Sequence, residues 1–384
     1  MENLPDDVLS DIFIRLRAKQ IAQMRCISKY WNAHFSQSSF INSHLDCSIH
    51  NKDRILLVFS TADPFNLEQF TIRPYIKLPN VIKLPVDTQF RDFTGEVIGS
   101  VNGLICFKYG PTPDSETIYI WNPSLSALLT VPPYSLPHLV DKYIQFHYFR
   151  FGYDPKTDDY KVFKHTEGFK YPIREYGYGY NLRVCETFPL KNWVQFEVYS
   201  MRKGSWKVIN RKIPSHLKLA YRPHHLCLDE YHPHLHWLGK NETGQVIVAF
   251  DLSTETFREI HLPVSIRHDE EILKYFGVLG GKLCVMSKVP DGECEVWVMG
   301  EYGVVESWVK RHVFRQFNYI DNLHFKSHGF TVHNEFIFQI DNRGVWLHDL
   351  IADTTKFFRF RDGWKGGVRV VEYVDSLVWV APAK

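Results

Sequence analysis

The sequence predicts a small helical domain followed by a much larger, mainly β domain with a propeller architecture. Three observations predict this fold class. Apolar residues recur at helical spacing only within about the first 45 positions. Aromatic residues make up 15% of the 384-residue chain, a bias that favours strands. Beyond residue 53, short aromatic and β-branched runs alternate with turn residues, in a pattern that returns about every 50 residues.

The first 45 residues predict a three-helix bundle. Apolar positions three and four residues apart mark one amphipathic helix over residues 4–16 and a second over 21–31. Pro5 suits a first helical turn, because its missing N–H would have no partner there. A third short segment around 35–45 completes the bundle. So small a bundle buries little surface alone, and we therefore expect an exposed apolar face that receives a partner.

One kind of hairpin recurs throughout the β region. Each copy has an apolar strand, a turn and a second strand that ends in an aromatic residue or Leu. Five successive copies are spaced 78, 51, 48 and 50 residues apart, and a period near 50 is that of kelch-like propeller blades. A sixth copy precedes them at Phe59. The five later copies begin at Trp121, Tyr199, Phe250, Val298 and His348.

A second kind of hairpin lies between copies of the first, and its six copies begin at Val97, Tyr148, His224, Tyr275, Ser327 and Val368. Six of each kind predict six four-stranded blades. The array begins with one kind and ends with the other, so residues 368–380 are predicted to pair with residues 55–72 in one closing blade. This closure leaves no open edge strand. A sandwich or an irregular β assembly is the alternative fold.

Charge and processing signals exclude several classes of protein. The net charge is +2, so we expect no broad basic surface for a nucleic acid partner. The chain starts with acidic residues rather than a signal peptide, and no run approaches the roughly 18 apolar residues of a membrane span. Seven scattered cysteines without a CxxC pair predict reduced thiols. We expect a protein of the cytoplasm, the nucleus or both, with no membrane partner.

Catalytic motifs are missing from the sequence. It contains no GxSxG elbow, HExxH pair, Walker lysine loop or Rossmann glycine set, so we expect a non-catalytic protein without a cofactor. A propeller enzyme is the rival hypothesis from another class. His232, His234 and His236 alternate as some metal sites require, but Pro233 indicates a turn there, and we predict no metal site.

Long connections between the predicted hairpins would all lie on one rim of the propeller, where recognition is usually found. After the helical domain, the chain would enter the ring at the third strand of the closing blade. That strand would begin on this long-loop rim, so we expect the helical domain there. The most distinctive connection is 164–192. Two alternative interpretations of this connection are an insertion without function and a site that binds phosphate or nucleic acid. Its aromatic and basic residues are of types enriched in interfaces and form our predicted substrate-binding set: Lys170, Tyr171, Arg174, Tyr176, Tyr178, Tyr180 and Arg183.

The N-terminal segment LPDDVLSDIFIRLRAKQIAQMRCISKYWNAHFSQSSFINSHL resembles a plant F-box. The likeness includes the opening Leu-Pro, the Arg-Cys-x-Ser-Lys-x-Trp core and the closing His-Leu. It implies docking onto the Skp-family adaptor of a cullin-based, SCF-type ubiquitin ligase. Arg17, Gln20 and Gln23 depart from the usual family residues. The adaptor-facing residues that the resemblance implies, several of which we expect inside the bundle, are Leu4, Pro5, Val8, Ile12, Leu16, Ile21, Met24, Ile27 and Trp31.

The rest of the chain resembles the F-box-associated domain of plant F-box/kelch-repeat proteins, a family that includes the S-locus F-box proteins. The likeness rests on motifs at 99–104, 121–124, 152–162, 198–200, 236–238 and 297–303. It implies an F-box over 1–45, a linker over 46–53 and a substrate-binding propeller over 54–384.

The implied function is that of a ligase substrate receptor. Its partners would be the adaptor, the cullin and RING subunits through that adaptor, and an unknown protein that is ubiquitinated and degraded. One alternative is a stand-alone propeller interaction module. Another is S-locus-type recognition of a pistil ribonuclease.

Overall fold

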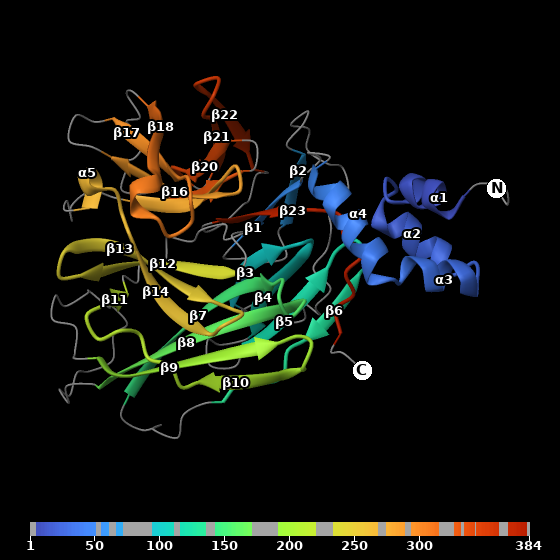
Figure 1. The fold of residues 1–384 in the computed structure, drawn as a ribbon, viewed down its shortest axis with the longest axis horizontal. Helices are drawn as coiled ribbons and strands as arrows, with labels where there is room; N and C mark the ends of the chain where they lie inside the picture. The colour runs from blue at the N-terminus through green and yellow to red at the C-terminus, as the bar shows by residue number, and fades with distance from the viewer. Residues whose placement is uncertain are drawn as a thin grey trace.

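The computed structural model of the chain shows a small group of helices standing at one side of a larger ring of β-sheets (Figure 1). The C-terminal residues lie near the helices, between them and the sheets (Figure 1). The residues that the structure describes are 5–50, 55–60, 67–71, 94–110, 116–135, 143–170, 191–219, 233–267, 274–288, 293–314, 326–331, 334–341, 343–360 and 368–381.

Four helices, rather than the predicted three, form the described N-terminal part. The second predicted helix is split, because Ser28 adopts an extended conformation with φ −152° and ψ 155°. Its hydroxyl accepts a hydrogen bond from the Trp31 N–H at 3.2 Å and so caps a new helix. The last helix continues to His50, through the first part of the predicted 46–53 linker. The helices are α1 (Asp6–Phe13), α2 (Ala18–Arg25), α3 (Lys29–Phe35) and α4 (Ser38–His50).

The helical core is made of side chains from all four helices. Phe13, Phe35 and Phe40 are buried in it, and the Phe13 and Phe35 rings meet edge to face at 5.2 Å. Leu377, from the far end of the chain, belongs to the same buried cluster. The helical unit is therefore completed by a residue of the C-terminal segment.

Five four-stranded antiparallel sheets form most of the β region, each in simple meander order among the described residues. The first comprises β3 (Thr94–Val101), β4 (Leu104–Gly110), β5 (Thr117–Asn122) and β6 (Ala127–Thr130). The second comprises β7 (Tyr143–Asp154), β8 (Asp159–Lys170), β9 (Lys191–Ser200) and β10 (Ser205–Ile209). The third comprises β11 (Lys218–Leu219), β12 (His234–Asn241), β13 (Gly244–Asp251) and β14 (Thr256–His261), and α5 (Val264–Arg267) follows it.

The fourth and fifth sheets follow the same plan. The fourth comprises β15 (Lys274–Leu279), β16 (Lys282–Lys288), β17 (Cys294–Met299) and β18 (Trp308–Phe314), with the short helix η2 (Val305–Ser307) before its last strand. The fifth comprises β19 (Lys326–Phe330), β20 (Glu335–Gln339), β21 (Gly344–Asp349) and β22 (Thr354–Arg359). A tight turn at Gly280 and Gly281 joins β15 to β16, whereas a longer turn that contains η2 joins β17 to β18.

A three-stranded sheet joins the two ends of the β region, in the order β2, β1, β23. It pairs β1 (Ile55–Ser60) with β2 (Leu67–Thr71) on one side and with β23 (Val368–Tyr373) on the other. Ile55 lies opposite Tyr373 and Ser60 opposite Val368, so the predicted pairing of the two ends is confirmed over these residues. The described residues hold five four-stranded sheets and this one, and the count of six four-stranded blades stays a prediction.

Strand β1 of the closing sheet buries side chains on both of its faces. Leu57 and Phe59 pack in one cluster with residues of β3 and β4, whereas Leu56 and Val58 pack in another with residues of β20 and β21. Successive strand residues point to opposite faces, so β1 contacts the first and the fifth sheet at once. This alternation closes the ring.

Residues 374–380 do not form the strand that the sequence predicts for them. They leave the sheet after β23 as an irregular segment, and β1 takes the place beside β23 that this strand would have filled. We call residues 374–381 the C-terminal strap. The strap leaves the sheet where β1 enters it, because Tyr373 and Ile55 are paired.

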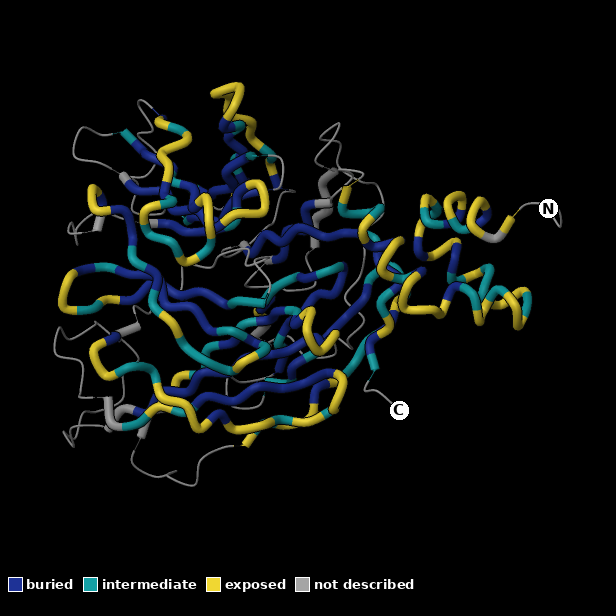
Figure 2. Tube along the Cα trace, viewed as in Figure 1, coloured by how far each residue is buried: buried dark blue, intermediate teal, exposed yellow. Residues whose placement is uncertain are grey.

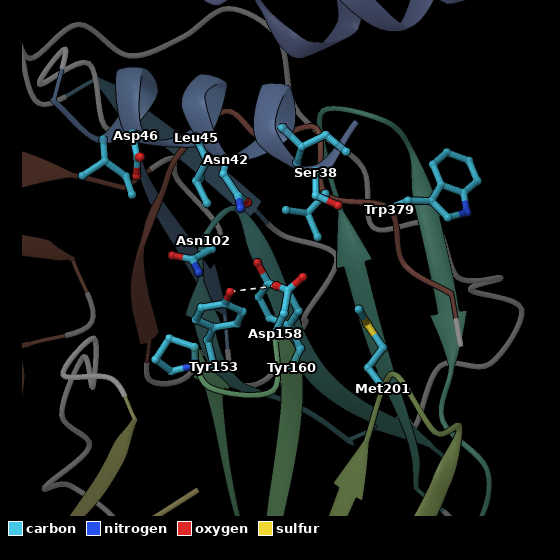
Figure 3. A pocket seen from close by; sticks show the side chains of 14 residues that line it. Ser38, Asn42, Leu45, Asp46, Asn102, Tyr153, Asp158, Tyr160, Met201 and Trp379 are labelled. Atoms are coloured by element: carbon cyan, nitrogen blue, oxygen red, sulfur yellow. Dashed lines mark hydrogen bonds between the residues drawn. The ribbon is translucent and has the colours of Figure 1, made fainter. Parts of the chain in front are cut away.

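The predicted position of the helical domain on the long-loop rim is wrong. The prediction placed β1 third in its sheet, but β1 is second, beside β23, which contacts β3 of the next sheet. The chain therefore enters on the opposite rim. Helix α4 and the strap lie there against the short hairpin turns at Asn102, Leu125 and Pro155 (Figures 1 and 3).

One of these short turns, between β7 and β8, is organised around the buried carboxylate of Asp154. This carboxylate accepts hydrogen bonds from Thr157 Oγ1 at 2.6 Å, Lys161 Nζ at 2.7 Å and the hydroxyl of Ser253. Lys161 also donates to the Leu252 carbonyl at 2.8 Å, so the network joins the second sheet to the third. Burial opposes ionisation, but the bonds from Lys161, Ser253 and Thr157 outweigh it and lower the pKa of Asp154 to about 2.

Replacing Asp154 is expected to lower stability and to flatten its acid dependence. Because the pKa is lower in the folded state, the stabilisation is complete above the unfolded pKa of about 4 and is lost as the pH falls toward 2. Asp154→Asn leaves the buried ammonium of Lys161 without its charge partner, at a cost of about 3 to 5 kcal/mol at pH 7. Urea unfolding at several pH values measures both effects. Equal slopes for the two proteins between pH 4 and pH 2 would contradict the assignment.

Candidate functional site

The helical domain presents large apolar side chains to solvent. Val8 and Ile12 are 40% and 48% exposed, and they share one side of α1 because they are four residues apart. Ile27, between α2 and α3, is 74% exposed, and Tyr30 on α3 is 54% exposed. We call these four residues the apolar helical surface, because exposed apolar side chains of this kind can bind a partner. Figure 2 shows many exposed positions along the outer side of the helices.

The predicted adaptor-facing residues fall into distinct groups. Pro5, Val8, Ile12 and Ile27 are exposed, and Leu4 lies outside the described residues. The other four pack against or within the helical core: Leu16, Met24 and Trp31 in part, and Ile21 completely.

Trp31 has a structural role that its sequence position did not reveal. Its ring meets Phe13 edge to face at 5.1 Å and stacks on Phe35 at 5.2 Å. The neighbouring Tyr30, which the prediction omitted, is the more exposed of the two aromatic residues. The sequence alone does not tell which of these two side chains faces the core, because that depends on how α3 packs against the other helices.

The start of α2 is held by its own sequence and by the strap. The Arg17 N–H donates to Gln20 Oε1 at 3.1 Å, so two of the departures from the F-box pattern together cap the helix. The next N–H, of Ala18, donates to Asp375 Oδ2 at 2.6 Å. A carboxylate at this end also complements the helix dipole. The strap therefore contacts the first turn of α2 directly.

The strap is anchored to the propeller by a motif that the sequence singled out, Trp-Asn-Pro-Ser at 121–124. Asn122 is fully buried and donates through Nδ2 to the carbonyls of Ser376 at 3.0 Å and Val378 at 2.8 Å. Its Oδ1 accepts the Ser124 N–H at 2.9 Å. The Ser124 hydroxyl donates to Asp375 and hydrogen-bonds to the hydroxyl of Tyr373. One turn of the first sheet thus holds three strap residues, Asp375, Ser376 and Val378, and the last residue of β23, Tyr373.

Gly103 shows how closely the strap approaches the propeller. Its φ is +78°, and a Cβ built there would lie 2.3 Å from Ser376 Cβ and 2.6 Å from the Val374 carbonyl oxygen. Both the backbone conformation and the space require glycine. The motif at 99–104 therefore also serves strap docking, a role that only the three-dimensional contact reveals.

A pocket of about 510 Å³ lies between α4, the strap and the short turns of the propeller (Figure 3). Asn42 and Asp46 of α4 face Asn102 and Asp158 of the turns, and Trp379 of the strap lies toward one end. The Tyr153 hydroxyl donates to Asp158 Oδ1 at 2.8 Å. Burial and the bond to Asp158 raise the pKa of the Tyr153 hydroxyl, which keeps it a neutral donor.

The predicted substrate-binding loop falls almost entirely outside the described residues. Lys170 is the last residue of β8, and Tyr171, Arg174, Tyr176, Tyr178, Tyr180 and Arg183 are not described. Gly168 is strand rather than loop, and a Cβ there would meet the Trp193 ring at 2.1 Å. A variant that deletes part of the 164–192 connection to test target binding should therefore keep residues 168–170.

Of the predicted histidine cluster, His232 lies outside the described residues, and His234 and His236 of β12 have partners in the third and fourth sheets, respectively. His236 Nε2 lies 2.8 Å from the Tyr302 hydroxyl, and His234 Nε2 lies 3.5 Å from Asp251 Oδ2. Among the described residues, no group of three or more His, Cys, Asp or Glu side chains could hold a metal ion. No helix in the described part of the chain has the length and apolarity needed to cross a membrane. Among the described cysteines, Cys26, Cys106 and Cys284 carry free thiols.

Comparisons with known proteins agree with this architecture. Residues 1–42 match the F-box domain, and residues 46–348 match the F-box associated beta propeller domain. The F-box protein CPR1 of Arabidopsis thaliana is 29% identical over 326 residues, covering 81% of this chain and 72% of the relative. The Arabidopsis F-box/kelch-repeat protein At3g23880 is 24% identical, covering 80% of this chain and 78% of its own.

Solved structures resemble the chain only distantly. TolB from Acinetobacter baumannii aligns over 88% of this chain and 73% of its own, with a TM-score of 0.39 and 8% identity. A likeness at this level has no bearing on function.

Proposed function

Because this chain belongs to the F-box-associated β-propeller family and carries an F-box domain at its N-terminus, we propose that it is a substrate receptor of an SCF-type ubiquitin ligase. The observation that carries the proposal is the apolar helical surface, which stands on a domain docked to one rim of the propeller. An F-box implies binding to a Skp-type adaptor. Cullin and RING subunits would join through that adaptor, in the cytoplasm or the nucleus.

The proposed mechanism is proximity without covalent chemistry in this chain. The helical domain binds the adaptor and the propeller binds a target protein, so a target lysine is held near the ubiquitin-charged subunit. A high effective concentration replaces a bimolecular encounter. The short-turn rim faces the adaptor side, and the strap fixes the angle between the two domains.

The adaptor contact is assigned to Val8, Ile12, Ile27 and Tyr30, with Leu4 and Pro5 at the helix start. Each side chain that becomes fully buried contributes roughly 1.5 to 3 kcal/mol. Leu16, Ile21, Met24 and Trp31 would support this surface from within. The target contact is proposed to include the aromatic and basic residues from Lys170 to Arg183, in a ring of six blades.

Co-elution on a size-exclusion column tests ligase assembly. The purified full chain is mixed with a plant Skp-family adaptor and a cullin, and we expect one complex that contains all three proteins. The cullin should enter only when the adaptor is present, because the chain offers the cullin no surface of its own in this scheme. Separate elution of the chain and the adaptor at micromolar concentration would reject the receptor assignment and favour a stand-alone binding module.

A further inference from the structure

The pocket between α4 and the short-turn rim has a distinct chemical character. Of the fourteen described residues that line it, two are carboxylates, Asp46 and Asp158, and none is Lys, Arg or His. The lining thus includes acidic but no basic side chains, although the chain as a whole has 45 Lys and Arg against 43 Asp and Glu residues. The pocket is therefore complementary to a positively charged group.

The remaining lining suits a long side chain with a flat cationic end. Three aromatic residues, Tyr153, Tyr160 and Trp379, border the pocket, and Trp379 is 60% exposed at its edge. Apolar side chains of α4, including Ile41 and Leu45, form the opposite wall. A guanidinium group can pair with a carboxylate and stack on an aromatic ring, while its aliphatic stem lies on apolar surface.

The carboxylate of Asp158 is already oriented for such a ligand. Asp158 occupies a turn position with φ +49°, and the Tyr153 hydroxyl fixes one of its oxygens at 2.8 Å. In Figure 3 this pair lies on the floor of the pocket beneath α4, beside Asn102. A pre-oriented acceptor binds a cation without first losing side-chain freedom.

We propose that this pocket is a docking site for an arginine side chain of a target protein. The inference rests on the proposed receptor function and assigns the chemistry of part of its target. Because α4 and the strap form two of its walls, the pocket exists only when the helical domain is docked on the propeller. A target seated there would lie beside the helical domain.

Calorimetric titration with the peptide acetyl-(Arg)₄-amide tests the proposal on the full chain, with acetyl-(citrulline)₄-amide as the neutral isosteric probe. We expect saturable binding of the arginine peptide that weakens with added salt, and at least about tenfold weaker binding of the citrulline peptide. Asp158→Asn should weaken arginine binding by about tenfold. Asp353→Asn is the matched control, because Asp353 also occupies a turn with φ +51° but lies outside the pocket.

Three results would overturn the proposal: equal affinity for the two peptides, equal losses in the two variants, or no binding of the arginine peptide. Adaptor binding is measured in the same preparations. A chain that binds the adaptor but not the arginine peptide refutes the pocket assignment alone. A chain that binds the peptide but not the adaptor refutes the receptor function instead.

Discussion

The double variant Ile12→Asp/Ile27→Asp is expected to bind the Skp-family adaptor at least about 100-fold more weakly than the unaltered chain, a loss of about 2.7 kcal/mol. Both side chains are large, apolar and exposed, at 48% and 74%. Burial at an interface would make them favourable contacts, whereas a carboxylate buried in the same place must lose its hydration. Surface plasmon resonance with immobilised adaptor measures the difference.

A matched control separates this effect from a general effect of added charge. Ile351 is 73% exposed in the turn between β21 and β22, away from the helical domain, so Ile351→Asp should leave adaptor affinity unchanged. The helices of the double variant should keep their circular dichroism, because neither replaced side chain is buried. Equal affinities for the double variant and the control would place the adaptor on another surface.

Leu377→Ala is expected to loosen the helical domain without unfolding the sheets. Leu377 is fully buried in the helical core, although it belongs to the strap. A buried Leu→Ala substitution costs about 2 to 5 kcal/mol, and a domain of about 45 residues has little stability to lose. Native-state hydrogen exchange on the full chain should show reduced protection of the amides in α2 and α3, with the strands unaffected.

The control for this prediction is another buried leucine. Leu252 is 1% exposed and packs between the second and third sheets, so Leu252→Ala should reduce protection in β12–β14 and leave the helices unchanged. Leu377→Met, which keeps the volume, should restore most of the helical protection. If Leu377→Ala leaves α2 and α3 fully protected, the strap is not part of the helical core.

The hairpins of the propeller were predictable because their signals are local. Asn102 and Gly103 adopt left-handed conformations with φ of 50° and 78°, as an Asn-Gly pair between two apolar runs predicts. Successive side chains of residues 56–59 and 369–373 point to opposite faces of the closing sheet, where they are buried. The pairing of these two segments was predicted from the order of the hairpins along the chain. Neighbouring residues therefore decide the turn, whereas the order of the hairpins along the whole chain decides which strands close the ring.

The strap was not predictable because its determinants lie far away in the sequence. Residues 374–380 carry apolar residues in a strand-like pattern, which favours a fourth strand. Instead Leu377 enters the helical core, Asp375 accepts the Ala18 N–H, and Asn122 holds the strap backbone. These tertiary contacts override the local pattern, and they also move the helical domain to the short-turn rim.

The adaptor surface was predictable only in part for a related reason. Helical spacing identifies apolar residues but does not tell which of them face the small core. Ile21 and Ile27 have the same side chain, yet the first is fully buried and the second is 74% exposed. The Ser28 cap starts a new helix and leaves Ile27 exposed between α2 and α3. A single capping residue is a weaker sequence signal than an apolar period that continues past it, so the sequence favours one uninterrupted helix.

Isothermal titration calorimetry of purified Skp-type adaptor into the full chain measures whether the helical domain binds the adaptor. We expect one-to-one saturable binding with a Kd of about 1 μM or tighter. The heat should disappear with Ile12→Asp/Ile27→Asp and persist with Ile351→Asp. No saturable heat from a chain that is folded by circular dichroism would show that the helical domain does not bind the adaptor.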